Sequence, residues 1–256
     1  MIGAEGVQVL GPDGPSIDLV EGEGSARALV WPDVGAEFRS MHLILLGAGA
    51  RTRRQRHQDE AVYYVLGGSG SVAGEQLEEG SMVHVAAGAA YVFEAGADGL
   101  ELIGGPSPPD AGVYEGVDAD GENEADPGAI RIFHRDNPDV MLPMIASDAR
   151  LVVWLGVGAR NANMNYVSMQ PGEENVPHAH ADSEDTIYIV SGCGTVEDLT
   201  HGFALEFEAG QAIQVPPGIQ HRVKADRGSP VVSVGGPCPA DVGMLKAAGV
   251  LPADLS

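Results

Sequence analysis

The feature that most constrains this fold is an internal repeat, because a chain that carries the same pattern twice folds as two similar units. The matched segments are SARALVWPDVGAEF with DARLVVWLGVGARN, EAVYYVLGGSGSV with EDTIYIVSGCGTV, GSMVHVAAGAAYV with GQAIQVPPGIQHR, and GGPSPPDAGV with GGPCPADVGM. The two tryptophans, Trp31 and Trp154, occupy equivalent positions at an offset of 123 residues. The matches follow the same order in both halves, which indicates two homologous units.

Each unit consists of short β-type segments separated by glycine and proline. Runs such as AVYYVL and TIYIV are β-branched and aromatic, and they have the length of strands. The 256 residues include 36 glycines and 17 prolines, which is too many for a helical bundle and typical of strands joined by tight turns. Only ADVGMLKAAGVL has a helical pattern. The sequence therefore predicts an all-β protein built from sandwiches or barrels, the jelly roll among them.

The repeat also predicts the division of the chain. We expect an N-terminal unit at residues 1–114, an acidic connection at residues 115–128 and a C-terminal unit at residues 129–256. The connection, EGVDADGENEADPG, has too few apolar residues to bury itself and is expected to be exposed. The segment IRIFHRDNPDVMLP follows it and is expected to start the second unit with a lead-in strand.

Charge and composition exclude several classes of partner. The 14 Lys and Arg against 37 Asp and Glu give a formal net charge of −23 at pH 7, which disfavours nucleic acids and anionic membrane surfaces. No basic start precedes an apolar core as in a signal peptide, and no apolar run has the length of a membrane span. Cys193 and Cys238 form neither a metal-type pair nor a disulfide framework. We therefore expect a cytoplasmic protein.

Three histidines and a carboxylate in the second unit have the spacing of a metal site. His178 and His180 are two residues apart, so on a strand their side chains point to the same face. His221 follows a Pro-Pro-Gly turn, and either Asp185 or Glu184 begins the strand between these elements. Three imidazoles and one carboxylate suit a divalent ion of iron, manganese, nickel, copper or zinc.

This pattern resembles the cupin superfamily, whose motifs read G-x5-H-x-H-x3–4-E-x6-G and G-x5-P-x-G-x2-H-x3-N. The family's glutamate position falls on Asp185 when counted back from Gly192, and on Glu184 by the shorter spacing from His180. Adjacent strand residues face opposite sides, so only one can be a ligand, and we favour Asp185. Ala225 replaces the asparagine of the second motif. The resemblance implies two tandem cupin jelly-roll β-barrels, a bicupin, with one divalent transition metal per chain.

The first unit has the same frame without the ligand set. Gln55 stands at the position of the first histidine, His57 retains the second, and Tyr91 replaces the third. Ala61, next to Glu60, fills the carboxylate position. We expect this unit to be a scaffold, or a second pocket without a metal. The basic stretch RTRRQRH beside it favours a solvated or interface patch over an anion site.

Four protein ligands on a six-coordinate ion leave two positions open for substrate, water or dioxygen. We therefore expect an enzyme, first of all a dioxygenase-type oxidoreductase whose small-molecule substrate chelates through hydroxyl, keto or carboxylate oxygens. One alternative is a non-redox metalloenzyme, an isomerase, lyase or hydrolase similar to ureidoglycine aminohydrolase. The other is a non-catalytic small-molecule binding protein. The sequence assigns no catalytic residue beyond the ligands, and a homodimer is compatible with it.

Overall fold

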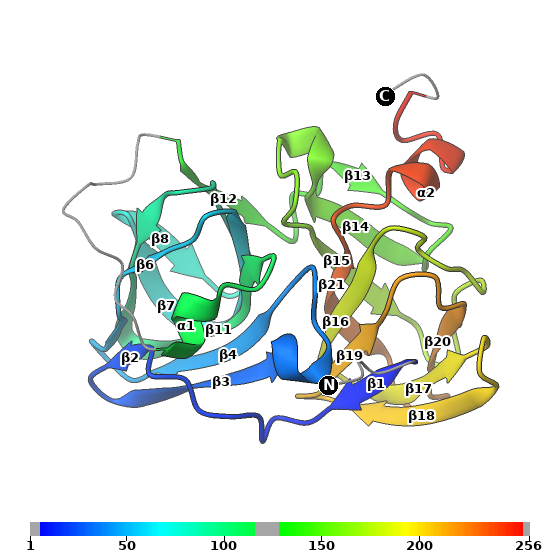
Figure 1. Ribbon diagram of the computed structural model, residues 1–256, viewed down its shortest axis with the longest axis horizontal. Coiled ribbons are helices and arrows are strands. Elements are labelled where there is room, and N and C mark those ends of the chain that lie inside the picture. Colours follow the sequence, from blue (N-terminus) through cyan, green and yellow to red (C-terminus); the bar gives the residue numbers. More distant parts are fainter. Residues whose placement is uncertain (1–5, 116–127, 253–256) are drawn as a thin grey trace.

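The computed structural model describes residues 6–115 and 128–252 and contains two β-barrels side by side (Figure 1). The predicted acidic connection at residues 115–128 lies almost wholly outside the described residues. The strands of the first half are β1 (Gln8–Leu10), β2 (Val20–Glu21), β3 (Gly24–Val30), β4 (Met41–Leu46), β5 (Arg51–Thr52), β6 (Gln55–Arg56), β7 (Glu60–Val72), β8 (Glu75–Glu78), β9 (Ser81–Val85), β10 (Ala90–Tyr91) and β11 (Phe93–Ser107).

The second half repeats this plan. Its strands are β12 (Ile130–His134), β13 (Val140–Met141), β14 (Asp148–Val153), β15 (Met164–Met169), β16 (Glu184–Ser191), β17 (Cys193–Asp198), β18 (Phe203–Glu208), β19 (Ala212–Val215), β20 (His221–Ala225) and β21 (Val231–Cys238). A short helix closes each half: α1 (Ala111–Glu115) and α2 (Val242–Ala247). The predicted all-β fold is confirmed, and α2 lies in the one segment with a helical pattern.

All pairings between the described strands are antiparallel, as expected for chains that turn through short glycine-containing loops. The first barrel combines a nine-stranded sheet, ordered β12-β9-β7-β11-β4-β3 along its main path, with the pair β10-β6. The second combines a seven-stranded sheet, ordered β1-β19-β16-β21-β15-β14-β13, with the three-stranded sheet β18-β17-β20. Inward-facing residues of these sheets form a separate hydrophobic cluster in each barrel.

The two halves exchange their first strands. β1 pairs with β19 of the second barrel, and Gln8 lies opposite Gln214. β12 pairs with β9 of the first barrel, and Arg131 lies opposite His84. Figure 1 shows β1, in dark blue, among the yellow and orange strands of the other barrel. The expected lead-in strand thus exists but joins the first sheet, so the domain boundaries at residues 114 and 129 stay a prediction.

The repeat seen in the sequence is also present in the backbone. A 3-10 turn follows each tryptophan, at Pro32–Val34 and at Leu155–Val157. The residue that ends each turn, Gly35 or Gly158, has a left-handed conformation with φ of 93° and 86° respectively. Glycine adopts this conformation without the steric penalty that a Cβ atom imposes, which explains the glycine at both positions.

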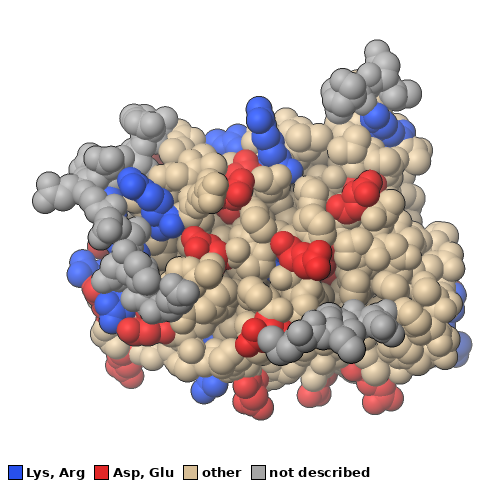
Figure 2. All heavy atoms as spheres, in the orientation of Figure 1, with Lys and Arg blue, Asp and Glu red and all other residues tan. Residues whose placement is uncertain are grey.

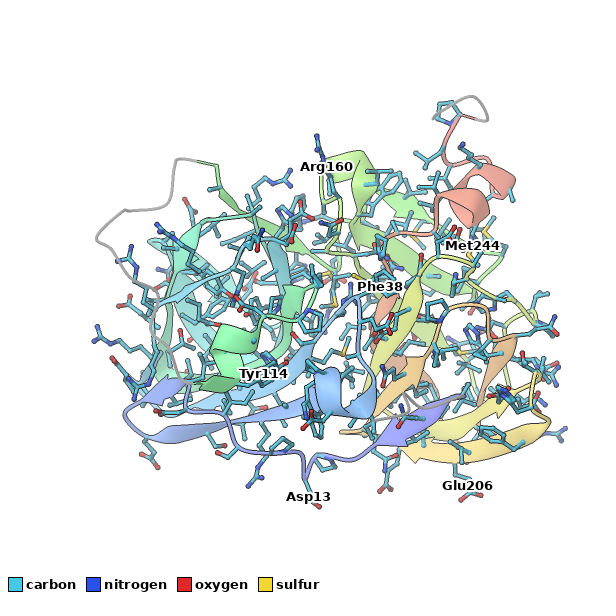
Figure 3. The ribbon with its side chains drawn as sticks, in the orientation of Figure 1. Asp13, Phe38, Tyr114, Arg160, Glu206 and Met244 are labelled. Atoms are coloured by element: carbon cyan, nitrogen blue, oxygen red, sulfur yellow. The ribbon has the colours of Figure 1, made fainter. Side chains whose placement is uncertain are left out.

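The loop after each turn is held by a glutamate of the opposite barrel. Glu184 accepts hydrogen bonds from the backbone N–H groups of Glu37 and Phe38, at 2.8 and 3.1 Å. Figure 3 shows Phe38 between the two barrels. Glu60, at the equivalent position of the first barrel, accepts bonds from three consecutive N–H groups at residues 160–162, at 2.6–3.0 Å. The two carboxylates therefore join the barrels by a pseudo-symmetric pair of contacts.

A third hydrophobic cluster lies between the barrels and draws on both. Its fully buried members include Met41, Val62 and Tyr64 from the first half and Val153 and Met164 from the second. Since burial of each such side chain contributes about 1.5–3 kcal/mol, the two barrels stabilise each other through a common core.

No helix of the described residues is long and apolar enough to cross a membrane. On the face in Figure 2, carboxylates are scattered across both barrels, whereas Lys and Arg lie mostly toward the edges.

Candidate metal centre

The four candidate ligands come from three parts of the second barrel. His178 and His180 lie in the extended segment between β15 and β16, Asp185 is on β16, and His221 is the first residue of β20. His178 and His221 exchange backbone hydrogen bonds of 3.1 and 2.8 Å, which bring their two segments together. The expected strand at His178 and His180 is reduced to this single bridge.

These side chains converge on one point. One ligand atom from each of His178, His180, Asp185 and His221 lies within 4.8 Å of all the others. The Oδ2 atom of Asp185 is 3.3 Å from Nε2 of His221 and 3.7 Å from Nε2 of His180. All but the half-buried His178 are buried.

A hydrogen bond at the far nitrogen orients each imidazole. Nδ1 of His178 contacts the carbonyl oxygen of Val176 at 2.9 Å, and Nδ1 of His221 contacts that of Ile219 at 3.0 Å. Because a carbonyl oxygen only accepts, Nδ1 must be the donor, and in the neutral ring Nε2 then carries the lone pair. Metal-binding histidines in proteins are positioned in this way.

The third imidazole, that of His180, is oriented by a carboxylate. Its Nδ1 atom lies 2.8 Å from Oδ2 of Asp241, which also caps α2 by accepting a bond from the N–H of Met244 at 2.8 Å. Asp241 was not singled out from the sequence. The available signal was the repeated ending of the units, where Asp110 in GGPSPPD matches Asp241 in GGPCPAD.

Two buried polar atoms of this cluster have no hydrogen-bond partner, Nε2 of His180 and Oδ1 of Asp185. Buried polar atoms are nearly always satisfied, so unpaired ones beside further donor atoms indicate a missing ligand. Three imidazole nitrogens and one carboxylate oxygen are a donor set for a divalent transition metal. These four residues therefore fit one divalent transition-metal ion. Their donor atoms do not distinguish between the possible metals.

The electrostatics of the cluster agree with this donor set. Burial alone raises the pKa of Asp185, but its contacts with His180 and His221 outweigh burial and hold that pKa well below its usual value. Burial lowers the pKa of His180, but Asp185 and Asp241 outweigh it and raise that pKa to about 9. Burial and the neighbouring His221 lower the pKa of His178. The lowered pKa of Asp185 favours its ionised form, and the raised pKa of His180 means that protons compete with a metal for that imidazole.

Glu184, the other acidic residue considered for this site, is not brought together with the imidazoles. Its carboxylate points to the opposite side of β16, where it accepts bonds from the loop of the other barrel and from Nε2 of Gln214 at 3.0 Å. The alternation of side chains along a strand gives the two neighbours these different roles. The geometry therefore favours Asp185 over Glu184 as the fourth ligand.

A cavity that is partly open to solvent lies beside the cluster. Its walls come from β15, β16, β20 and β21 and from the start of α2, which carries Met244 (Figure 3). His178, His180 and Asp185 are among its lining residues. A small molecule in this cavity would reach the ligand atoms directly.

The equivalent place in the first barrel holds a hydrogen-bonded cluster instead. His57 contacts Asp110 through Nδ1 at 2.8 Å, as His180 contacts Asp241, but its Nε2 atom contacts the hydroxyl of Tyr91 at 2.8 Å. That hydroxyl lies 2.6 Å from the hydroxyl of Tyr63 and 3.3 Å from the amide oxygen of Gln55. Within residues 6–115 no group of metal-binding side chains like that of the second barrel is found.

The basic stretch of the first unit makes local ion pairs. Arg51 contacts Glu21 at 2.6 Å, and Arg53 contacts Asp18 at 3.1 Å. These pairs are consistent with a solvated surface patch.

Comparison with known proteins agrees with this architecture. A model of the cupin domain matches residues 165–234. The crystal structure of Lactobacillus farciminis oxalate decarboxylase in complex with formate has a TM-score of 0.73 at 16% identity, covering 94% of this chain and 88% of that one. No curated protein sequence matches this chain.

Two structures of Bacillus subtilis oxalate decarboxylase are similar in the same way. One, determined at pH 4.6, has a TM-score of 0.69 at 15% identity, covering 94% of this chain and 77% of that one. The other, from work on the Mn(II) centres of that enzyme, has a TM-score of 0.70 at 15% identity and covers 94% and 78%. The chain therefore has the fold of a bicupin, and residues 165–234 match the cupin domain model.

Proposed function

We propose that this protein is a metal-dependent bicupin enzyme that acts on a small organic molecule. In this proposal His178, His180, Asp185 and His221 hold one divalent transition metal in the second barrel, and the first barrel is a scaffold without a metal. The observation that carries the proposal is the convergence of four ligand atoms within 4.8 Å beside an open cavity.

Once bound, a divalent ion at this place would polarise an oxygen ligand or, with a redox metal, support electron transfer to it. The protein side chains have supporting tasks. Asp241 keeps the ring of His180 in one orientation, and the carbonyl groups of Val176 and Ile219 do so for the other two rings. The cavity walls beside the ligand atoms are partly aliphatic, and they include Ile187 and Val223.

For the reaction type, our first proposal is a dioxygenase-type oxidoreductase acting on a chelating substrate. The second is a non-redox metalloenzyme, and specifically a lyase, because the similar structures are decarboxylases. Cupin folds host many reactions, so the metal and the substrate, and not the fold, decide between these two. The third proposal is a non-catalytic binding protein. It would use the same metal ligands and would differ from the enzymes only in the absence of turnover.

The test begins with the metal content of the purified full-length protein, measured together with its stoichiometry. We expect close to one transition-metal ion per chain. Less than a tenth of an equivalent, after purification and after incubation with Fe(II), Mn(II) and Zn(II), would refute the proposal. With the metal known, oxygen consumption on a panel of chelating substrates supports the dioxygenase. Anaerobic turnover, including carbon dioxide release from carboxylic acids, supports the lyase.

A further inference from the structure

We propose that the substrate is a largely apolar molecule with one oxygen-bearing, hydrogen-bond-donating end, and that small dianions such as oxalate are not substrates. This inference rests on the proposed function, because the oxygen-bearing end would meet the metal there. It is carried by three properties of the cavity beside the ligand cluster: the chemistry of its walls, the charges around it, and the residues that make room for it.

The walls of the cavity are mainly aliphatic. Ile187 and Ile189 on β16, Val223 on β20, and Met244 and Leu245 on α2 all line it. An apolar body gains about 25 cal/mol for each Å² of surface that such walls remove from water, whereas a fully polar molecule gains nothing from them. The walls therefore select a substrate with a substantial hydrocarbon part.

Apart from the proposed metal ion and its histidine ligands, the charged side chains that line the cavity are carboxylates. Asp185 and Asp241 are the carboxylates that line it, and its lining includes no lysine or arginine within the described part of the chain. Recognition of a carboxylate normally relies on such cations, which form charge-assisted hydrogen bonds with it. A small dianion would gain nothing from the aliphatic walls, and any carboxylate of it that does not contact the proposed metal would be desolvated here without a cationic partner, which is costly.

The first barrel shows how the cavity arises. At three equivalent positions Tyr63, Phe93 and Leu102 of the first barrel correspond to Ile187, Val223 and Ser233 of the second. The three first-barrel residues are fully buried, and the rings of Tyr63 and Phe93 pack at 4.9 Å between centroids.

All three of the second-barrel counterparts, Ile187, Val223 and Ser233, line the cavity. At these three positions the framework is thus filled in the first barrel and open in the second, because the second barrel has the smaller side chain at each of them. The space belongs to the sequence of the second unit and is not a general property of the fold.

Two asparagines supply the polar contacts. Asn163 is buried and donates to the carbonyl oxygen of Pro237 at 2.9 Å, but its amide oxygen has no partner. The amide oxygen of Asn165 is also buried and unpartnered, and both residues line the cavity. Oxygen acceptors of this kind call for a donor on the ligand, such as a hydroxyl group. The substrate end therefore combines oxygen atoms with at least one O–H or N–H group.

Straight-chain hydroxamates provide the probe, since they combine chelating oxygens and donors with an alkyl chain of chosen length. We would titrate the metal-loaded full chain with acetohydroxamate, butanohydroxamate, octanohydroxamate and oxalate by calorimetry. Burial of each methylene should tighten binding by about threefold to fourfold until the cavity is full. Oxalate should bind at least about tenfold more weakly than octanohydroxamate. Affinity that is independent of chain length, or tightest for oxalate, would overturn the inference.

The variants Ser233→Leu and Val223→Phe place the first-barrel residue in the second-barrel cavity. Each should weaken octanohydroxamate binding by about tenfold or more while acetohydroxamate binding and metal stoichiometry stay unchanged. Val232→Leu is the matched control, because Val232 is next to Ser233 on β21 but is not among the residues that line the cavity. This variant should leave octanohydroxamate binding, acetohydroxamate binding and metal stoichiometry unchanged. Unchanged octanohydroxamate affinity in a folded, metal-loaded variant would also overturn the inference. Failure of the wild-type chain to bind metal would refute the proposed function instead.

Discussion

At the scale of single residues, the geometry of this site depends on the hydrogen bond that Nδ1 of each imidazole makes. His178 and His221 direct Nδ1 to carbonyl groups of their own segments, and His180 directs it to Asp241. Each ring is therefore oriented without a bound ion, and the Nε2 atoms of His180 and His221 face Asp185. This preorganisation lowers the entropic cost of binding an ion.

We expect one metal ion per chain, held in the second barrel. His178→Ala or His221→Ala should each remove most of the metal, because each takes away one of four donor atoms. His57→Ala, in the equivalent place of the first barrel, should leave the metal content unchanged, since His57 is bonded to Tyr91 and Asp110. Elemental analysis of the purified variants measures this. Two equivalents bound with similar affinity would contradict it.

The neighbouring residues Asp185 and Glu184 should give opposite phenotypes. Asp185→Ala should lose the metal, because its carboxylate lies among the imidazoles. Glu184→Ala should keep the metal but lower the free energy of unfolding by about 1–3 kcal/mol, because two N–H groups of residues 37–38 lose their acceptor. Metal analysis and urea unfolding separate the two effects. Metal loss in the Glu184 variant alone would show that the shorter spacing was the correct register.

At the scale of elements, the exchange of β1 and β12 is supported by two series of side-chain contacts, one in each half, with the same arrangement. Gln8 donates to Gln214 at 3.1 Å, and Gln214 donates to Glu184 at 3.0 Å. In the other half Arg131 contacts His84 at 3.0 Å, and His84 lies 3.2 Å from Glu60. Each exchanged strand is thus linked to the glutamate that holds the opposite loop, so the exchange and the loop contacts form one unit.

Removal of residues 1–10 should therefore destabilise the second barrel, although these residues are distant from it in sequence. β19 would lose its neighbour on one side and expose hydrogen-bonding groups and apolar surface. A loss of about 2 kcal/mol would lower Tm by about 4–8 °C in a protein of this size. Gln8→Ala keeps β1 but removes its side-chain bonds, and should give a smaller shift in the same direction. An unchanged Tm after the deletion would show that β1 contributes little.

At the scale of the whole molecule, we expect the two barrels to fold as one unit, because they share a hydrophobic cluster, exchange strands and hold each other's loops. The first barrel has a structural role that needs no metal ligands. It supplies β9 as the partner of β12, and Glu60 as the hydrogen-bond acceptor for residues 160–162.

The contact at Glu60 predicts an acid dependence of stability. Burial opposes ionisation, but the close contact with His84 and the hydrogen bonds from residues 160–162 outweigh it and lower the pKa of Glu60 to about 2, from an ordinary value of 4.5. A carboxylate with a lowered folded-state pKa stabilises the protein above pH 4.5 and loses this contribution as pH falls from 4.5 to about 2.

In Glu60→Gln the free energy of unfolding should be lower near neutral pH by about 1–3 kcal/mol, and its difference from wild type should shrink in acid. Urea unfolding at several pH values measures the difference, and a constant difference would contradict the assignment.

A fragment with only the second unit, residues 126–256, should aggregate or unfold more readily than the full chain, although it contains every candidate ligand. It lacks β1, leaves β12 without β9, and exposes the half of the shared cluster that includes Val153 and Met164. Size-exclusion chromatography, metal analysis and thermal unfolding test this expectation. A monomeric, stable and metal-loaded fragment would mean that the first barrel has a role of its own.

The two-unit organisation and most of the candidate site could be predicted from the amino-acid sequence. The repeated segments identified equivalent positions, and the spacing of His178, His180 and His221 identified a metal-type set, because strand alternation and turn chemistry are local properties that a sequence displays. The replacement of ligands by Gln55, Ala61 and Tyr91 was visible for the same reason.

The tertiary structure alone decided which of two adjacent acids faces the imidazoles, which barrel each first strand joins, and that Asp241 orients His180. It also decided that the second barrel is hollow where the first is filled. These features depend on contacts between residues far apart in the chain, such as Glu184 with Phe38 or Gln8 with Gln214. Local sequence pattern does not specify such partners, because they become neighbours only when both barrels have packed together.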